Sequence, residues 1–301
     1  MCIACVISYV DAVTGQRIII VLDNRDGIII SKFLGARKLK DVVTQTAFDQ
    51  IHNVGDIIGL FNDDKYANGQ LAADNTRGAL IVDERLHEQD IRRAIKTWGK
   101  ERGGFCTTFL KSNLGAFDYA CNCAKIENQH PHLFACWDIE SGFATYRTDD
   151  DTLQYTPWTS KQTIDSPFVF IAQTQGQTPN IRKTTLESAA RALLCTKPAD
   201  DSVWFNKGLN LLQNSDLAPV GVTTLELGKD SAYERLVESV RIPYSESAIK
   251  PGSLMGWATR TSAVLVMHQG GLSHMTSRHY AVPTDVAHLD LVYKDEYVKT
   301  N

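Results

Sequence analysis

The hydrophobic positions of the first thirty residues predict β structure. Residues 2–10 are apolar and rich in β-branched side chains, and residues 17–22 form a second run of the same kind. Turn-forming residues at 11–15 separate the two runs, so we expect a β-hairpin. Residues 24–27 then form a polar break, after which strand character resumes at 28–31.

The rest of the chain alternates between short apolar runs and amphipathic stretches. The short runs predict strands at 57–61, 79–83, 133–138, 142–147 and 168–174, and a late hairpin of 254–268 and 272–282 about Gly270-Gly271. Helices are predicted at 87–100, 184–195 and 203–213; in the first, Ile91, Ala94, Ile95 and Trp98 share one face. Strands at both ends with helices between them favour stacked sheets covered by helices, an α+β fold. We expect one domain over residues 1–301, because we find no linker, internal repeat or low-complexity tract.

Composition and charge argue against several classes of protein. The chain has 301 residues and a formal net charge of −4, so no strongly basic stripe indicates a nucleic-acid partner. The apolar segment 3–9 is too short for the core of a signal peptide, and the longest aliphatic run, 18–22, has the length of a strand rather than of a membrane span. We therefore expect a cytoplasmic protein with no membrane span.

The seven cysteines support the same compartment. They are Cys2, Cys5, Cys106, Cys121, Cys123, Cys136 and Cys195. An odd number of dispersed cysteines in a long chain fits reduced thiols better than a disulfide framework.

Cys2 is the first candidate for chemistry. It follows Met1, and a small second residue normally permits removal of the initiator methionine, which would leave Cys2 with a free α-amino group. Such an amine has a pKa near 8, so one residue would supply both a nucleophile and its base. The alternative is a cysteine of a buried strand without any chemical role.

A polar cluster after the second strand is expected to lie beside Cys2. If the first two strands pair as a hairpin, Leu22 lies roughly opposite the start of the first strand, and the cluster 23–26 follows at once. Arg25 would lower the pKa of the thiol, and an aspartate of the cluster, Asp23 or Asp26, would hold the α-amine by a charge-assisted hydrogen bond. The alternative is a polar turn with a surface ion pair.

Two later segments add candidates. Asn75 precedes a turn into the strand 79–83 and offers an amide for a developing oxyanion, although the segment by itself favours a plain Asx turn. Arg260 interrupts an otherwise apolar strand, where a buried guanidinium would need a carboxylate or a bound anion. The alternative is a position on the solvated face of that strand.

Taken together, these segments resemble the NRDE family, also called the transport and Golgi organisation protein 2 family. The resemblance rests on Met1-Cys2-Ile3, on Asn24-Arg25-Asp26, on Thr76-Arg77-Gly78, and on Ala258-Thr259-Arg260-Thr261-Ser262 running into an aliphatic strand. The spacing of these segments matches the family across nearly the whole chain. One departure is that Gly27 stands where the family has glutamate, which puts the role of that glutamate in doubt here.

The resemblance implies a four-layer αββα sandwich of the N-terminal-nucleophile hydrolase type, similar to choloylglycine hydrolases and penicillin acylases. It implies catalytic roles at Cys2, Arg25, Asp26 and Asn75, with Gln175 as a second oxyanion donor. The activity implied by the distant relatives is hydrolysis or acyl transfer on a small-molecule linear amide through a thioester on Cys2. No cofactor would then be needed.

The closer family is also linked to haem handling, which implies a non-catalytic haem carrier or chaperone as the alternative. The candidate axial ligands are Cys2, His52, His87, His130, His132, His268, His274 and His279. The chain lacks a C-x-x-C-H motif for covalent attachment of haem. Cys121 and Cys123 with His130 and His132 do not have the usual spacing of a structural zinc site, so we predict no metal.

Overall fold

The protein is described here by a computed structural model. It describes residues 2–30, 50–61, 69–83, 104–126, 132–148, 150–173, 181–197, 200–214, 240–241, 255–280 and 293–301. The helix predicted at 87–100 lies outside these ranges.

Within the described ranges, six strands form a first sheet, called sheet A, in the spatial order β10-β1-β2-β11-β12-β13. In chain order its strands are β1 (Ile3–Val10), β2 (Arg17–Ile30), β10 (Phe168–Gln173), β11 (Met255–His268), β12 (Ser273–Tyr280) and β13 (Tyr293–Lys299). All neighbouring strands are antiparallel. The predicted hairpins at the two ends of the chain therefore meet in the middle of one sheet, where β2 pairs with β11.

The second sheet, sheet B, is an antiparallel meander in which the described strands follow one another in chain order. They are β3 (Gln50–Val54), β4 (Ile57–Phe61), β5 (Gly69–Ala73), β6 (Arg77–Asp83), β7 (His132–Asp138), β8 (Gly142–Arg147) and β9 (Thr152–Pro157).

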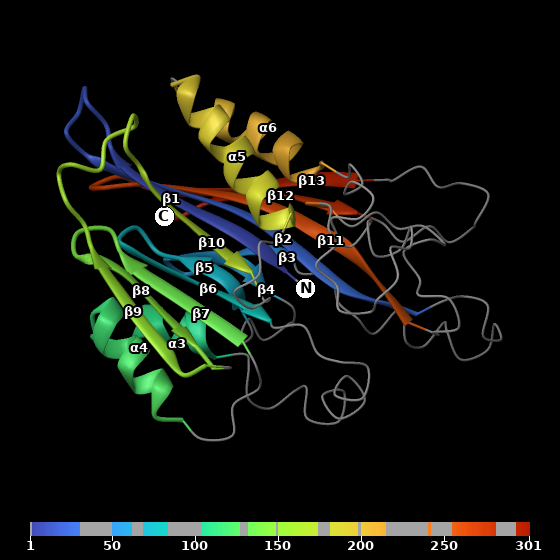
Figure 1. Ribbon diagram of the computed structural model, residues 1–301, viewed down its shortest axis with the longest axis horizontal. Helices are drawn as coiled ribbons and strands as arrows, with labels where there is room; N and C mark the ends of the chain where they lie inside the picture. Colours follow the sequence, from blue (N-terminus) through green and yellow to red (C-terminus); the bar gives the residue numbers. More distant parts are fainter. Residues whose placement is uncertain are drawn as a thin grey trace.

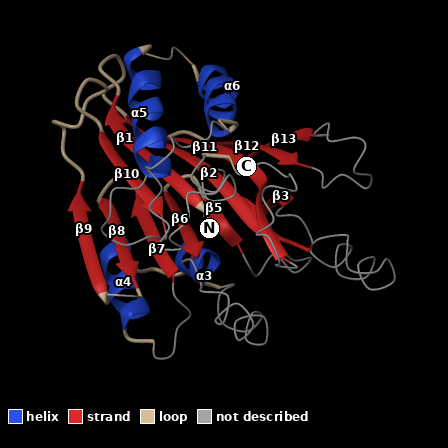
Figure 2. Ribbon diagram, turned by 45° about the vertical axis from the view of Figure 1, so that its right-hand side comes forward, coloured by secondary structure: helices blue, strands red, loops and turns tan. Residues whose placement is uncertain are grey.

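Helices cover the outer face of each sheet, as Figures 1 and 2 show. On sheet A these are α5 (Ile181–Cys195) and α6 (Asp201–Leu212), and on sheet B they are α3 (Phe105–Lys111) and α4 (Ala116–Ala124). The expected four-layer αββα sandwich is thus confirmed. None of the described helices is both long and apolar enough to span a membrane.

The four layers enclose three apolar cores, and β1 contributes to two of them. Ala4 and Val6 pack between the two sheets, whereas Ile3, Cys5 and Ile7 pack against α5 and α6. A strand that is buried on both faces has no polar positions to alternate with apolar ones. This explains the nearly continuous apolar run at the start of the sequence.

The polar break predicted at 24–27 is wrong, because β2 continues through it to Ile30. The polar side chains at this position have partners inside the protein: Arg25 pairs with Asp23, and Ser262 donates a hydrogen bond to Asn24. Buried polar groups are tolerated in a strand when they are hydrogen-bonded in this way. The sequence therefore reads as a turn although the backbone stays extended.

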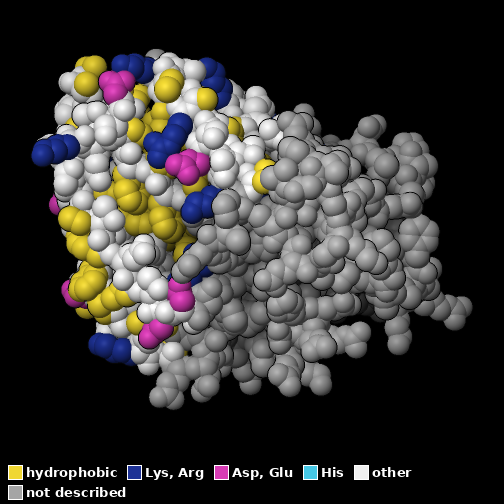
Figure 3. Space-filling model, in the orientation of Figure 1, with side chains coloured by type: hydrophobic (Ala, Val, Ile, Leu, Met, Phe, Trp, Pro, Cys, Tyr) yellow, Lys and Arg dark blue, Asp and Glu magenta, His cyan; other side chains and the backbone are white. Residues whose placement is uncertain are grey.

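The edges formed by β9 and β10 leave aromatic side chains at the side of the sandwich. Hydrophobic side chains gather on this side in Figure 3. Phe143 of β8 packs on Phe168 and Phe170 with ring centroids 5.1 and 4.9 Å apart, and Trp158 packs on Phe168 at 5.2 Å. Phe143 is buried, and the partly buried Trp158, Phe168 and Phe170 pack against the core between the sheets.

Candidate active site

Cys2 lies directly before β1 and points into the layer between the two sheets. Its side chain is only 3% exposed and belongs to the core cluster shared by both sheets. In the register of the hairpin, Ile3 pairs with Asn24, so Cys2 falls beside Arg25 when the register is continued by one residue. The thiol Sγ lies 3.9 Å from the backbone carbonyl oxygen of Asp26.

The polar cluster of β2 divides between the two faces of sheet A. Successive residues of a strand point to opposite faces. Asp23 and Arg25 therefore face sheet B, on the same side as Cys2, whereas Asn24 and Asp26 face the helices. The family resemblance selected Arg25 and Asp26, whereas strict alternation along β2 places Arg25 with Asp23.

Arg25 is fully buried and joins the two sheets. Its Nε donates to Asp23 Oδ2 at 2.5 Å, and the two side chains are 1% and 0% exposed. Its Nη1 donates to the backbone oxygen of Ile81 at 2.5 Å and to Gln70 Oε1 at 3.2 Å, while Nη2 donates to the backbone oxygen of Gln70 at 2.7 Å. Arg25 therefore places a positive charge, compensated by Asp23, beside the start of β1.

Asp26 has partners on the opposite face from the thiol. Its Oδ2 lies 2.7 Å from Arg182 Nη2, with both side chains at most 1% exposed, and its Oδ1 accepts a hydrogen bond from Thr259 Oγ1 at 2.6 Å. Arg182 also donates to the backbone oxygen of Val240 at 2.9 Å. The described contacts of this carboxylate are thus with α5 and β11, and the predicted contact with the α-amine of Cys2 is not among them.

Asn24 anchors the same part of β2 to the helix layer. Its Nδ2 donates to the backbone oxygens of Leu212 and Val240, each at 2.9 Å. Its Oδ1 accepts from Ser262 Oγ at 2.5 Å, and that hydroxyl also lies 2.9 Å from the Tyr280 hydroxyl. These contacts fix the backbone that carries Arg25 at the edge of the candidate site.

A second polar group, absent from the sequence-based prediction of catalytic residues, extends across sheet A from Arg25. Thr261 is the register partner of both Arg25 and His279. Thr261 Oγ1 lies 3.2 Å from His279 Nδ1, and His279 Nε2 lies 3.0 Å from Ser277 Oγ and 3.4 Å from Glu296 Oε2. These residues share one face of sheet A because they are paired on neighbouring strands. The sequence could have indicated this only if the strand order had been known.

Asn75 is placed elsewhere, at the turn between β5 and β6. Its Oδ1 accepts hydrogen bonds from the Ser273 backbone amide at 3.0 Å and from the Thr300 hydroxyl. Gln70, which contacts Arg25, precedes Asn75 by five residues on this hairpin, so the two lie roughly 15 Å apart. The structure therefore does not bring Asn75 to Cys2, and its amide links sheet B to sheet A instead.

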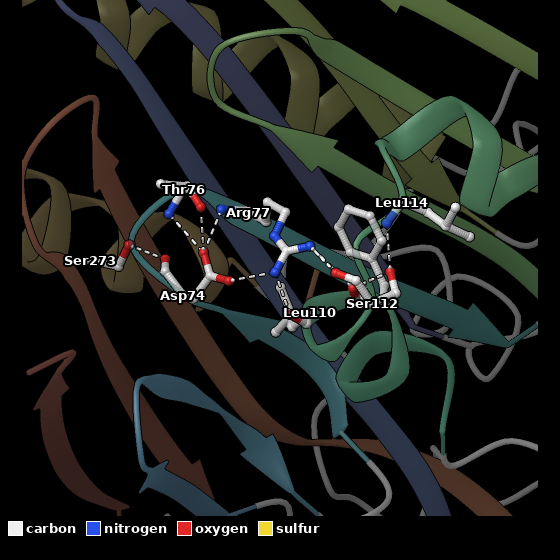
Figure 4. A network of polar contacts seen from close by, with 8 residues as sticks. Asp74, Thr76, Arg77, Leu110, Ser112, Leu114 and Ser273 are labelled. Carbon is white, nitrogen blue, oxygen red and sulfur yellow. Dashed lines mark hydrogen bonds and ion pairs between the residues drawn. The ribbon is translucent and has the colours of Figure 1, made fainter.

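The turn that holds Asn75 is an Asx turn, but Asp74 forms it (Figure 4). Asp74 Oδ1 accepts from the backbone amides of Thr76 and Arg77, both at 2.7 Å, while Ser273 Oγ donates to the Asp74 backbone oxygen at 2.6 Å. Arg77 in turn donates to the backbone oxygens of Leu110 and Ser112, with 2.6 Å for the second contact. Free carbonyls at the end of a helix need such partners, so the Thr76-Arg77-Gly78 segment fixes α3 to sheet B.

Gln175 and Arg260 are the two remaining residues of the predicted site. Gln175 lies outside the described residues. Arg260 occupies the position in β11 where the register with β2 shifts, between Thr259 opposite Asp26 and Thr261 opposite Arg25. An extra residue of this kind forms a β-bulge, and bulges commonly redirect a strand beside a functional site.

We also searched the described residues for a metal site. They contain no group of three or more His, Cys, Asp or Glu side chains arranged to hold a metal ion. Cys123 is buried in the core between α4 and sheet B, whereas Cys121 is half-buried. His87 and His130, two of the candidate haem ligands, lie outside the described ranges.

No protein-family model and no curated protein sequence matches the chain. Among solved structures, the chain is similar to the Caenorhabditis elegans ortholog of N-acylethanolamine-hydrolyzing acid amidase, with 10% identity, 87% of this chain and 92% of that chain covered, and a TM-score of 0.41. It is also similar to the C2A mutant of conjugated bile acid hydrolase from Clostridium perfringens, with 10% identity, 99% and 97% coverage, and a TM-score of 0.37.

Proposed function

We propose that the protein cleaves a linear, non-peptide amide through an acyl-thioester on Cys2, and passes the acyl group to water or to an acceptor amine. The observation that supports this best is the position of Cys2 at the start of a central strand, beside the buried Arg25–Asp23 pair. A neighbouring guanidinium favours the thiolate, the form of cysteine that attacks carbonyl carbon. A cysteine with a solely structural role needs no such neighbour.

In the proposed reaction, removal of Met1 leaves Cys2 with a free α-amine, which takes the proton of the thiol. The thiolate attacks the amide carbonyl, the C–N bond breaks, and the leaving amine takes the proton from the α-ammonium group. Water then attacks the thioester, so that a carboxylic acid departs and the thiol is restored. An amine in place of water gives transfer of the acyl group, and neither route needs a cofactor.

The surrounding residues have separate roles in this proposal. Arg25 and Asp23 set the electrostatics beside the thiol, and Arg25 also holds the two sheets at a fixed separation through Gln70 and Ile81. Asn24 fixes the middle of β2 to the helix layer. Asn75 lies far from Cys2, so we assign it the role of linking the two sheets and not that of oxyanion donor.

The test is hydrolysis of a panel of N-acyl amides by protein whose intact mass lacks Met1, with Cys2→Ala as the critical variant. Cys5→Ala is the matched control, because Cys5 lies on the same strand but faces the helices, where burial raises the pKa of its thiol. We expect Cys2→Ala to abolish turnover and to form no acyl adduct. Cys5→Ala should retain both the turnover and the acyl adduct. Equal turnover by native protein and Cys2→Ala would refute the proposal.

Haem carriage stays a prediction of the sequence. No contact among the described residues favours it, since His268 and His274 pair with Asp201 while His279 contacts Thr261 and Glu296. We therefore do not propose it.

A further inference from the structure

We infer that the buried ion pair between Asp26 and Arg182 controls the protonation of the Cys2 thiol from the opposite side of sheet A. Arg182 is then a positioning residue of the candidate site, although it lies on α5, far from Cys2 in sequence. The inference rests on the proposed function in one respect: amide cleavage is the reaction for which the protonation of the thiol would matter.

The pair is fixed and desolvated. The 2.7 Å contact between Arg182 Nη2 and Asp26 Oδ2 joins side chains that are 1% and 0% exposed. The Thr259 hydroxyl holds the second carboxylate oxygen at 2.6 Å, and the backbone oxygen of Val240 accepts from the guanidinium at 2.9 Å. Further hydrogen bonds therefore hold both members of the pair in place inside the protein.

The pair is also close to the thiol. The backbone carbonyl of Asp26 lies 3.9 Å from Cys2 Sγ, so only the thickness of one strand separates the sulfur from this ion pair. Salt screens charges in water over about 8–10 Å, but it screens buried charges much less. The thiol therefore responds to any imbalance between the two members of the pair.

Among the described residues, charged side chains near the thiol lie in pairs of opposite sign. On the face that Cys2 shares with sheet B, Arg25 is compensated by Asp23 and His279 contacts Glu296. The Sγ atom of Cys106 in α3 lies 3.9 Å from the backbone oxygen of Gln70. Burial raises the pKa of this thiol to about 12, so the thiol is neutral at ordinary pH. In the mature protein the α-amine of Cys2 adds a further titratable group at this position. Removal of one member of the Asp26–Arg182 pair changes the net charge near the sulfur by one.

A purely structural interpretation is that Arg182 only ties α5 to the end of β2. The two interpretations predict different results for the two single variants. Loss of a structural tie would lower stability and change thiol reactivity in one common direction. Loss of a charge balance changes the thiol midpoint in opposite directions, because Asp26→Asn leaves a cation and Arg182→Met leaves an anion.

The experiment measures the rate at which iodoacetamide alkylates Cys2, read from the mass of the N-terminal peptide, from about pH 5 to about pH 10. For a charge roughly 8 Å away at an effective dielectric constant of about 20, the expected shift in midpoint is on the order of one pH unit. We expect Asp26→Asn to lower the midpoint and Arg182→Met to raise it. The double variant, which is again neutral, should return to the native midpoint.

Two further variants keep the test decisive. Arg182→Lys retains the charge and should keep a near-native midpoint, even if a single charge-removing variant fails to fold. Glu187→Gln removes a charge from the half-exposed Glu187–Arg191 pair on the same helix, with 2.9 Å between the partners, and should have no effect. Far-UV circular dichroism confirms that each variant is folded.

The inference is overturned if Asp26→Asn and Arg182→Met change the midpoint in the same direction, if neither changes it, or if Arg182→Lys behaves as Arg182→Met does. The measurement needs no amide substrate. Opposite shifts without any amide turnover would therefore uphold this inference while the proposed function fails, and turnover without shifts would do the reverse.

Discussion

Gly78→Ala tests whether the Thr76-Arg77-Gly78 segment is a structural clamp, that is, a segment that fixes α3 to sheet B and packs closely on Trp137. Gly78 pairs with Trp137 across β6 and β7. A Cβ atom at Gly78 would lie 2.4 Å from Cζ2 and 2.5 Å from Cε2 of the Trp137 indole. The glycine therefore leaves room for an aromatic ring, and its backbone conformation is not the reason for its presence.

The magnitude follows from how little the indole can move. Trp137 is fully buried, donates from Nε1 to Met267 Sδ at 3.2 Å, and stacks on Phe143 with centroids 6.4 Å apart. The added carbon would sit about 1 Å inside the usual carbon–carbon separation of roughly 3.5 Å, so the ring or the strand must shift. Overpacking of this kind costs about 1–3 kcal/mol, and we expect Gly78→Ala to lie near the upper end.

The assay is equilibrium denaturation in urea, which gives the free energy of unfolding from the midpoint and slope. Gly115→Ala is the matched control, because a Cβ at Gly115 meets nothing within 4 Å and its φ of −65° suits alanine. The control should cost less than about 1 kcal/mol. A loss for Gly78→Ala no greater than that of the control would refute the packing argument.

Three further outcomes follow from the described contacts. Arg77→Met removes the charged donor from the carbonyls at the end of α3, so we expect a loss of about 2–3 kcal/mol and faster amide hydrogen exchange in α3; unchanged exchange would contradict the clamp. The pKa of His268 is raised by its hydrogen bond to Asp201, so their contribution is fully present below about pH 6.5 and is lost as the pH rises through the raised value. The difference in unfolding free energy between native protein and Asp201→Asn should therefore shrink toward alkaline pH. A difference that grows with pH would contradict the stabilising role of the His268–Asp201 contact. At about pH 8, iodoacetamide should label exposed Cys195 readily but not Cys106, whose thiol has a pKa of about 12 owing to burial; equal labelling would contradict the burial.

Much of the sandwich was predictable because its central strands have an unmistakable pattern. The boundaries of β8 agree with the sequence to the residue, and those of β10, α6 and β11 differ by one or two residues. The resemblance to a known family supplied the number of layers. Weak elements escaped prediction: β9 has no buried residue and β13 is strongly charged, so neither has an apolar signal.

The candidate site was predictable only in part. Sequence reasoning found Cys2 and Arg25, because the hairpin brings them together at one end of adjacent strands. For the aspartate, sequence reasoning took Asp26 from the family resemblance. The residues alone left Asp23 and Asp26 open, because they were read as a polar break, to which alternation between faces does not apply. Sequence reasoning had no means of finding Arg182, whose contact with Asp26 exists only once α5 packs on sheet A.

Asn75 shows why a short motif alone was insufficient. The segment Asn75-Thr76-Arg77-Gly78 has the composition expected beside an oxyanion, yet Asn75 binds the start of β12 and the C-terminal Thr300. The same residue types satisfy an Asx turn, a helix end and a close packing position. The distinction between these uses depends on which end of the sheet the turn occupies, which one chain segment cannot reveal.

The intact mass of the protein after expression in a cytosol tests the central claim most directly. An amine-activated nucleophile requires that Cys2 be the first residue of the mature chain, with its α-amino group unmodified. The account predicts a mass that lacks Met1 and carries no other modification. A mass that retains Met1, or that shows a blocked α-amine, would leave Cys2 without its base and would contradict the proposed function.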